Sequence, residues 1–247
     1  AADRIAAGIA GAAALASGLV RIHTESPLYD AFLQNEFHPV VESGFVAPVI
    51  AGFSTFRQAP DFVQAAGEIR EESLQAGPAD KYDSHPSLQE RLGALEIENA
   101  PETETLELGA TALELLEDAP GIERELLDYL LSGGSGDHEG TSIDWSETTE
   151  KVLMPRWKAI AQETMKILDP VRLDQVAMQL DDKAPRLIAA VIGNPDRHVG
   201  REHWPQILAG PVGAVMILSL DRNGWKIESE VGRSVTATKE SLRIEPF

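Results

Sequence analysis

The sequence predicts a mainly α-helical protein that ends in a small antiparallel β element. Through most of the 247 residues, apolar side chains recur at three- and four-residue intervals, which is the period of an amphipathic helix. After residue 222 they alternate with polar side chains around the turn-like pairs Asn223-Gly224 and Gly232-Arg233, a pattern typical of short strands. The hydrophobic content of 43% and the charged content of 25% are those of a globular chain that buries a core.

An uncharged, alanine-rich run over residues 5–20 is expected to form the first helix. It is not a typical signal peptide, because Asp3 and Arg4 stand where such a peptide has a basic start. Ser26 and Pro27 predict the N-cap and first position of a second helix. The larger residues of the first helix share one face, and we expect them to pack in the core: Ile5, Ile9, Leu15, Leu19 and Ile22.

The next hundred residues predict further helices. Residues 43–60 indicate a loop and a short packed helix, and residues 61–75 a polar helix that ends at a Gly-Pro turn. Ser87 and Glu90 have the spacing of a capping box, so a helix is expected to begin near His85 and Pro86. The segment from residue 96 to residue 128 holds eleven acidic residues and one basic residue, which favours acidic helices with one packed face.

The glycine-rich residues 133–137 are the best candidate for a linker. The expected organisation is therefore a helical domain over residues 1–97, an acidic helical connector over residues 98–143, and a helical module with short strands over residues 144–247. In that module Asp144 and Glu147 form a second predicted capping box. An apolar stretch over residues 203–220 contains two prolines and two glycines, which favours a core helix over a membrane span.

Composition excludes several functions. The formal net charge is −19, from 40 acidic and 21 basic residues, and such a surface repels nucleic-acid phosphates. The absence of cysteine excludes disulfides, thiolate metal sites and a cysteine nucleophile. There is no HExxH motif and no GxSxG elbow, and the closest histidines, His198 and His203, would point about 140° apart on a helix.

Two short patterns resemble the HtpX and CAAX-prenyl-protease family of membrane-associated zinc metallopeptidases, which are gluzincins. The opening Ala1-Ala2-Asp3-Arg4 is similar to the end of the family's ExxxD helix. The segment Asp83-Ser84-His85-Pro86, with Arg91 six residues after the histidine, is similar to the family's (S/T)HP…R segment. The end of the chain, from Leu218 to Phe247, has a looser similarity to the tail of some bacterial members.

The resemblance implies roles for three residues. The family's glutamate ligand to zinc would stand two residues before Ala1, and Asp3 would orient a zinc-bound histidine through the other nitrogen of its ring. His85 would face the zinc, and Arg91 would support the cleft. This chain would then be the C-terminal part of a zinc endopeptidase that cleaves polypeptides, and it would lack the HExxH helix.

The same resemblance places the full-length parent at the membrane, anchored by segments outside this chain. The present part would be soluble and cytoplasmic. Zinc would belong to the parent, and this chain alone is expected to hold none and to be inactive.

Two other interpretations stay open. The chain could be a non-catalytic acidic helical module that binds or regulates a protein partner through residues 96–131. It could also be an independent helical protein in which the short motif matches arise by chance.

Overall fold

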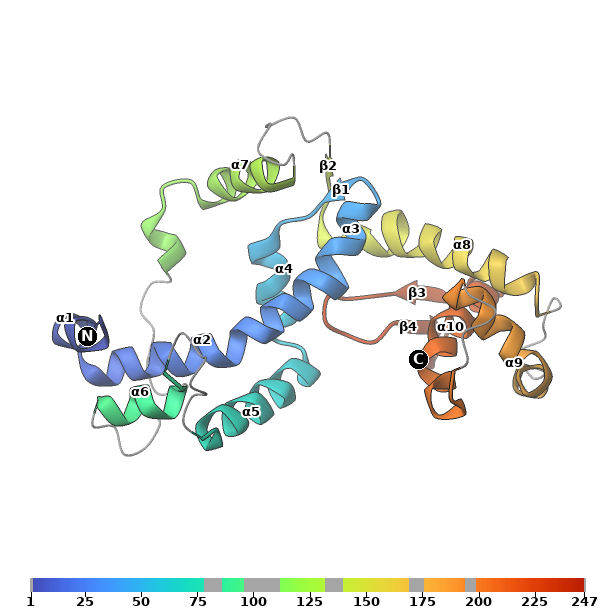
Figure 1. Cartoon of the computed structure of the whole chain (residues 1–247). Helices are drawn as coiled ribbons and strands as arrows, with labels where there is room; N and C mark the ends of the chain where they lie inside the picture. The colour runs from blue at the N-terminus through green and yellow to red at the C-terminus, as the bar shows by residue number, and fades with distance from the viewer. Residues whose placement is uncertain are drawn as a thin grey trace. The chain divides into compact units, whose positions relative to one another are not determined.

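The computed structural model describes residues 2–77, 86–95, 112–131, 140–168, 176–193 and 199–246 (Figure 1). It is mostly helical and carries one three-stranded antiparallel sheet near the C-terminus, so the predicted fold class is confirmed. The chain divides into two compact units, Ala1–Ser142 and Ile143–Phe247, called unit 1 and unit 2 below. The sequence predicts a connector over residues 98–143. Its described residues up to Ser142 belong to unit 1, and Ile143 belongs to unit 2.

Unit 1 is organised around a long helix, α2 (Ala12–Phe32), which runs through a π-helical turn, η1 (Leu33–Phe37), into α3 (His38–Glu42). The predicted helix start at Ser26 and Pro27 is wrong, because Pro27 lies inside α2. Thr24, Leu28 and Phe32 are buried at four-residue spacing on either side of it. Because this packed face continues past Pro27, it stabilises the helix on both sides of the proline. The helix therefore does not begin at the local start signal.

The alanine-rich run forms two helices instead of one. Gly11 has a φ of 89° and separates α1 (Ala2–Ala10) from α2, and the two axes differ by 120°. Because α1 leaves the line of α2, Ile5 and Ile9 are 67% and 84% exposed. Ile22 lies on α2 itself and is 62% exposed. The expectation that these three isoleucines pack in the core is therefore wrong, whereas Leu19 is buried.

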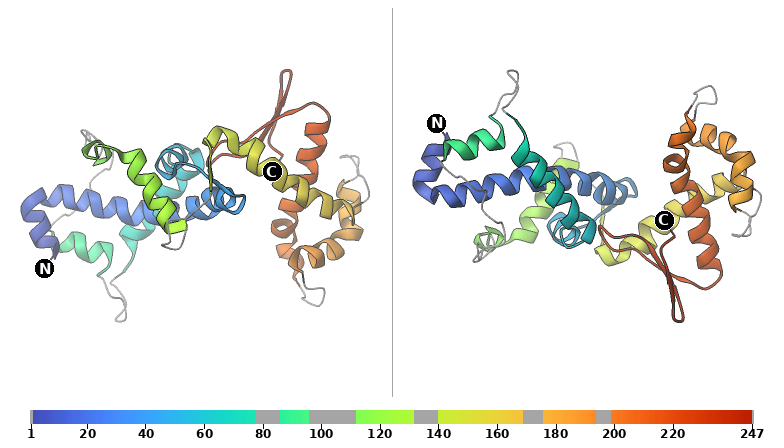
Figure 2. Two further views of the ribbon diagram at one scale, coloured as in Figure 1. Left: turned by 90° about the horizontal axis from the view of Figure 1, so that it is seen from above. Right: turned by 90° about the horizontal axis from the view of Figure 1, so that it is seen from below.

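Three further helices contact this scaffold, as the views of Figures 1 and 2 show. They are α4 (Val49–Phe56), α5 (Pro60–Gln75) and α6 (Leu88–Ala94). One core lies between α2 and α6 and consists of Ala16, Leu19, Val20, Leu88 and Leu92. A second cluster is aromatic, with Tyr29 at its exposed edge, and its neighbouring rings are 4.9 to 6.4 Å apart between centroids: Tyr29, Phe32, Phe53, Phe56 and Phe62.

The last elements of unit 1 are η2 (Ala112–Leu115), α7 (Ala119–Leu131) and a two-residue parallel pairing of β1 (Phe45–Val46) with β2 (Thr141–Ser142). No residue of α7 is buried. The helix is tied to α4 by Glu123, whose Oε1 accepts a 2.7 Å hydrogen bond from the backbone N–H of Ile50. This carboxylate satisfies a donor in the first turn of α4, where an anion is favoured.

Unit 2 begins with η3 (Trp145–Glu147) and η4 (Thr149–Leu153), which lead into α8 (Met154–Met165). Glu147 accepts a 2.9 Å hydrogen bond from the backbone N–H of Asp144, as the predicted capping box requires. The remaining helices are α9 (Val176–Ile192), η6 (Arg201–His203) and α10 (Trp204–Arg222).

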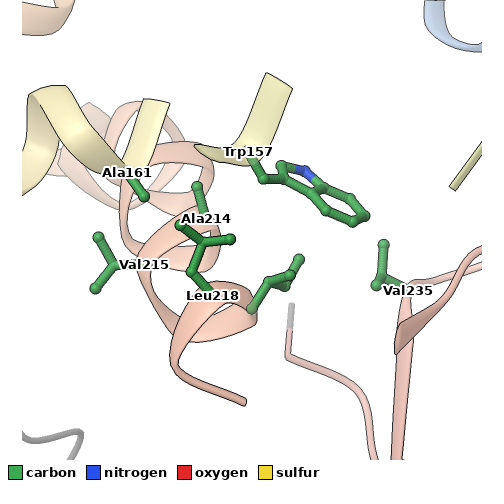
Figure 3. Close-up of a cluster of buried hydrophobic side chains, with 7 residues drawn as sticks. Trp157, Ala161, Ala214, Val215, Leu218 and Val235 are labelled. Carbon is green, nitrogen blue, oxygen red and sulfur yellow. The ribbon is translucent and has the colours of Figure 1, made fainter. Parts of the chain in front are cut away.

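The core of unit 2 forms where α8 packs on α10 (Figure 3). Trp157 and Ala161 of α8 meet Ala214 and Leu218 of α10, and Val235 covers the tryptophan side. Among the described residues, Arg201–Arg222 is the single helix long and apolar enough to cross a membrane, and the bent pair of α1 with Ala12–Glu42 qualifies only if it counts as one span. Buried core helices pass the same test, and 39% of the most apolar window of α10 is buried.

The chain ends in the sheet β3 (Lys226–Glu228), β4 (Thr236–Lys239) and β5 (Leu242–Ile244), in that order. Ile227 pairs with Ala237, and Thr238 pairs with Arg243. Ala237 is fully buried and alternates with more exposed neighbours, as expected for a sheet with one covered face.

Candidate functional site

Two of the three residues that the sequence singled out meet in the structure. The guanidinium of Arg91 donates two hydrogen bonds to the carboxylate of Asp3, from Nε to Oδ2 at 2.9 Å and from Nη2 to Oδ1 at 2.7 Å. The two residues are 88 positions apart in the chain. The pair is bidentate, which is the strongest and most directional arrangement of an arginine with a carboxylate.

Arg91 is positioned by the short helix α6. Ser87 caps that helix: its Oγ accepts from the N–H of Glu90 at 3.3 Å, and its own N–H donates to Glu90 Oε2 at 2.9 Å. Leu88 and Leu92, one turn apart, are 3% and 5% exposed and pack on α2. Because these leucines fix the rotation of α6, the arginine between them is directed to the edge of the contact with α2.

Asp3 is brought to Arg91 by the bend at Gly11. Asp3 lies in the first turn of α1, and α1 folds back beside the start of α2, where α6 also packs. The φ of 89° and ψ of 145° at Gly11 belong to a region that residues with a Cβ avoid. A glycine at this one position therefore decides whether the two charged side chains can meet.

Electrostatics favours the charged forms of both partners. The hydrogen bonds from Arg91, together with its positive charge, hold the pKa of Asp3 below its ordinary value of 3.8, against an opposing contribution from burial. The hydrogen bonds to Asp3 likewise raise the pKa of Arg91. The side chains are 28% and 25% exposed, so the pair lies at the surface and is partly screened by solvent.

His85, the third predicted site residue, lies outside the described residues, as do His138 and His198. Within the described ranges, no three histidine, aspartate or glutamate side chains come close enough together to hold a metal ion. His85 precedes the cap residue Ser87 by two positions in the sequence.

The pair can organise a surface as well as stabilise the fold. Arginine carries five N–H donors, and the hydrogen bonds to Asp3 use two of them. A carboxylate offers about four acceptor positions, so Asp3 can accept from a further donor while it binds Arg91. The resemblance implied separate roles for these residues, and their pairing was not anticipated from the sequence.

Two features of unit 1 were missed at the level of sequence. One is the bend at Gly11, for which a glycine within a helical pattern is the only local indication. The other is a group of arginines between α2 and α5, which the acidic composition of the whole chain conceals.

Comparison of the chain with protein families, with curated proteins and with solved structures gives no significant match.

Proposed function

We propose that this chain is the C-terminal portion of a membrane-associated zinc endopeptidase of the HtpX and CAAX-prenyl-protease kind. In this proposal Asp3, Arg91 and His85 form one flank of the peptidase cleft. The full-length parent binds a polypeptide and hydrolyses it with zinc-activated water, and this chain alone is inactive.

The observation that carries the proposal is the bidentate pair of Asp3 and Arg91. Asp3 and Arg91 belong to two separate motif matches, and neither match requires the two residues to touch. Both residues would line one cleft in the proposed peptidase, and a direct contact across 88 positions is compatible with that arrangement. The contact is what a shared cleft wall would need, because a fixed arginine presents its other donors in a defined direction.

The described residues do not themselves supply a zinc site, since no three suitable ligands gather there. As the resemblance implies, the zinc ligands of the parent stand upstream of Ala1 in this proposal. In this proposal the chain positions groups of the cleft. Asp3 neutralises and orients Arg91, and α6 holds the residues just after His85 against α2.

The upstream reading frame gives the first test. The proposal requires a glutamate two residues before Ala1 and an HExxH motif further upstream, with apolar spans nearby, and their absence would end it.

In the full-length protein, casein hydrolysis should fall at least about tenfold in Arg91→Ala and in His85→Gln, the loss expected when a donor to developing charge is removed. Zinc content, measured by mass spectrometry, should stay at the wild-type level in both variants. Arg233→Ala serves as the matched control, because Arg233 forms an exposed pair with Glu230 in unit 2. Equal activity in all three variants would contradict the assignment.

A second candidate, a protein-binding module, is favoured by the surface of α7. Four apolar side chains at helical spacing are 48% to 61% exposed on this helix: Ile122, Leu126, Tyr129 and Leu130. The acidic residues Glu123, Glu125 and Asp128 border them. An apolar stripe bordered by acids matches a basic amphipathic segment of a partner.

Pull-down with the wild type and with Leu126→Ser and Leu130→Ser tests this second candidate. Both substitutions remove exposed apolar area and leave the charge unchanged. A partner that is retained at low salt, lost at 0.5 M salt and lost with either serine variant would support the module, since the acidic contribution is screened. If neither salt nor the two substitutions change the amount of partner retained, the apolar stripe of α7 is not the binding surface.

A further inference from the structure

A groove with a volume of about 750 Å³ runs along the first strand of the C-terminal sheet in unit 2. One wall is β3 with its flanking residues, 225–230, and the other is a helical face formed by η4 and α8 (Figure 1). Consecutive side chains of a strand point to opposite faces of a sheet, so a groove lined by six residues in a row follows the edge of the strand. We propose that this edge binds an extended peptide that carries a lysine or an arginine.

The outer edge of β3 pairs with no other described strand, because the order in the sheet is β3-β4-β5. The ladder with β4 ends at Glu228, and the next residue, Ser229, directs its main chain to Thr149 instead. The N–H of Ser229 donates to Thr149 Oγ1 at 3.1 Å, and its C=O accepts from the same hydroxyl at 3.3 Å. Main-chain groups of a strand point to alternate sides from one residue to the next. The N–H and C=O of Ile227, two residues before Ser229, are therefore directed away from β4 and into the groove.

Protein contacts close this edge at both ends and leave its middle open. Thr149 covers Ser229 at one end, and at the other end the N–H of Trp225 donates to the C=O of Leu220 at 3.1 Å. Between them, within the part of the chain that the structure describes, the main chain of Ile227 has no partner on the groove side. A strand edge of this kind accepts a further strand through main-chain hydrogen bonds. The open part is about three residues long, which is about 10 Å at the strand rise.

The opposite wall is one face of the helical segment that passes from η4 into α8. Glu150, Met154 and Lys158 line it at four-residue intervals, which places them on one side of the helix. Met154 and Ile227 both pack against the core of unit 2, so the groove has an apolar floor. In an added strand, the two residues that flank a basic residue share the opposite face. Apolar side chains at these two positions would meet the floor.

The side chains of the groove carry an excess of negative charge. Four acidic residues and two lysines line it, which gives a net charge of −2: Glu150, Asp221, Glu228, Glu230, Lys158 and Lys226. Glu228 forms an ion pair with Lys226, and Glu230 forms one with Arg233, which does not line the groove. These two carboxylates are neutralised within the protein, and the charge offered to a partner lies elsewhere in the groove.

Glu150 and Asp221 supply that charge. Neither carboxylate forms an ion pair with another described residue. Lys158 lies on the same helical face as Glu150 but eight residues further along, which is about 12 Å of helix. Glu150 follows Thr149 directly, so it is placed to pair with a basic side chain of a peptide bonded to the edge. A second copy of this chain is a less suitable occupant, because each copy carries −19.

Isothermal titration of the whole chain with capped heptapeptides tests the proposal. The probe has the sequence Ser-Thr-Val-Lys-Val-Thr-Ser, in which two valines flank one lysine. It should bind with a Kd on the order of 0.1 mM, and the affinity should fall as salt is added. The matched peptide with glutamate in place of the lysine should bind at least about tenfold more weakly, because it meets Glu150 with a like charge. No saturable binding of the lysine peptide up to about 2 mM would overturn the proposal.

Two backbone-methylated forms of the probe distinguish an added strand from simple attraction of charges. One carries an N-methyl group on the lysine and the other on the valine that follows it. Because the N–H groups of a strand alternate in direction, one form should bind like the probe and the other at least about tenfold more weakly. Equal binding of the two forms would contradict strand addition. In isotope-labelled protein, hydrogen exchange at the N–H of Ile227 should slow when the probe binds, and unchanged exchange would also contradict it.

A substitution in the helical wall tests the charge contact. Glu150→Gln should weaken binding of the lysine peptide about tenfold, because it removes the carboxylate that the lysine meets. Glu163→Gln is the matched control, since Glu163 lies on the same helix in an exposed pair with Lys166 and does not line the groove. Both substitutions are at exposed positions, and circular dichroism checks that both variants are folded. If the two variants bind the lysine peptide equally well, Glu150 does not select it and the proposal is wrong.

Sedimentation of the chain alone tests the other occupant. A dimer that the lysine peptide dissociates would show that a second copy fills the edge, and it would overturn the proposal of a basic partner. The groove lies wholly within unit 2, apart from the pair of Asp3 and Arg91 and from α7 in unit 1. Failure of these tests would therefore leave the proposed peptidase relationship unaffected.

Discussion

Replacement of Gly11 by alanine should disturb the bend that brings Asp3 to Arg91. Gly11 has φ 89° and ψ 145°, and a Cβ placed there would meet no neighbouring atom. The cost of the substitution is therefore one of backbone conformation, about 1–3 kcal/mol for a residue forced into this region. The chain either bears this cost in the bent form or relieves it by joining α1 and α2 into one straighter helix.

Joining α1 and α2 into one helix would move α1 a long way. The segment from Asp3 to Gly11 spans eight residue steps and forms an arm about 12 Å long at the helical rise per residue. Rotating this arm through the observed 120° would move its end by about 20 Å, far beyond the reach of Arg91. Loss of the bidentate pair would follow directly.

Two measurements decide between these outcomes. Urea denaturation followed by circular dichroism gives the free energy of unfolding. Nitroxide labels on Arg4→Cys and Gln89→Cys report the distance between α1 and α6, and the chain has no cysteine of its own to interfere. We expect Gly11→Ala to be destabilised by about 1–3 kcal/mol or to show a longer distance between the labels.

Gly8→Ala is the matched control. Gly8 lies within α1 with no atom near its absent Cβ, so alanine should stabilise the helix by about 0.5–1 kcal/mol and keep the distance between the labels. If Gly11→Ala has the stability and the label distance of the wild type, the bend between α1 and α2 does not depend on a glycine at position 11.

Three further substitutions test the scaffold around the site. Ser87→Ala removes the capping box of α6 and should lower the free energy of unfolding by about 1 kcal/mol, measured by urea denaturation; no loss would mean that the cap does not hold the helix. Phe32→Ala removes a fully buried ring in contact with three other aromatic rings and should cost about 3–5 kcal/mol, while a cost below that of a surface substitution would show the cluster to be loosely packed. The stability lost in Asp3→Asn should be constant well above pH 3.8 and should vanish as the pH falls through the lowered pKa of Asp3, because a carboxylate with a depressed pKa stabilises the folded state only while it is ionised. A difference between wild type and Asp3→Asn that does not change with pH would show that the charge of Asp3 is not what Arg91 recognises.

The sequence alone was sufficient for features that depend on neighbouring residues. The period of the apolar side chains identified the helices, and their alternation after residue 222 identified the C-terminal strands, because these periods are set by local backbone geometry. The capping pairs Ser87 with Glu90 and Asp144 with Glu147 were predicted for the same reason, since they join residues three positions apart.

Prediction failed where packing outweighed local preference. Ser26 and Pro27 predict a helix start, but α2 continues through Pro27 because Thr24, Leu28 and Phe32 form one buried face on both sides of it. The helical spacing of Ile5 and Ile9 predicts core positions, but the bend at Gly11 turns them to solvent. In both places a short pattern was compatible with two conformations, and contacts elsewhere in the chain selected one of them.

The candidate site also combines residues that the sequence identifies with contacts that depend on the tertiary structure. Motif resemblance selected Asp3 and Arg91 as separate residues, and only the tertiary structure joined them, because their contact depends on one glycine bend and on the packing of α6 against α2. The cavity lined by arginines between α2 and α5 could not be predicted from the sequence. Arg21, Arg57 and Arg70 are dispersed through an acidic chain, and they line one cavity only when α2, the end of α4 and α5 come together.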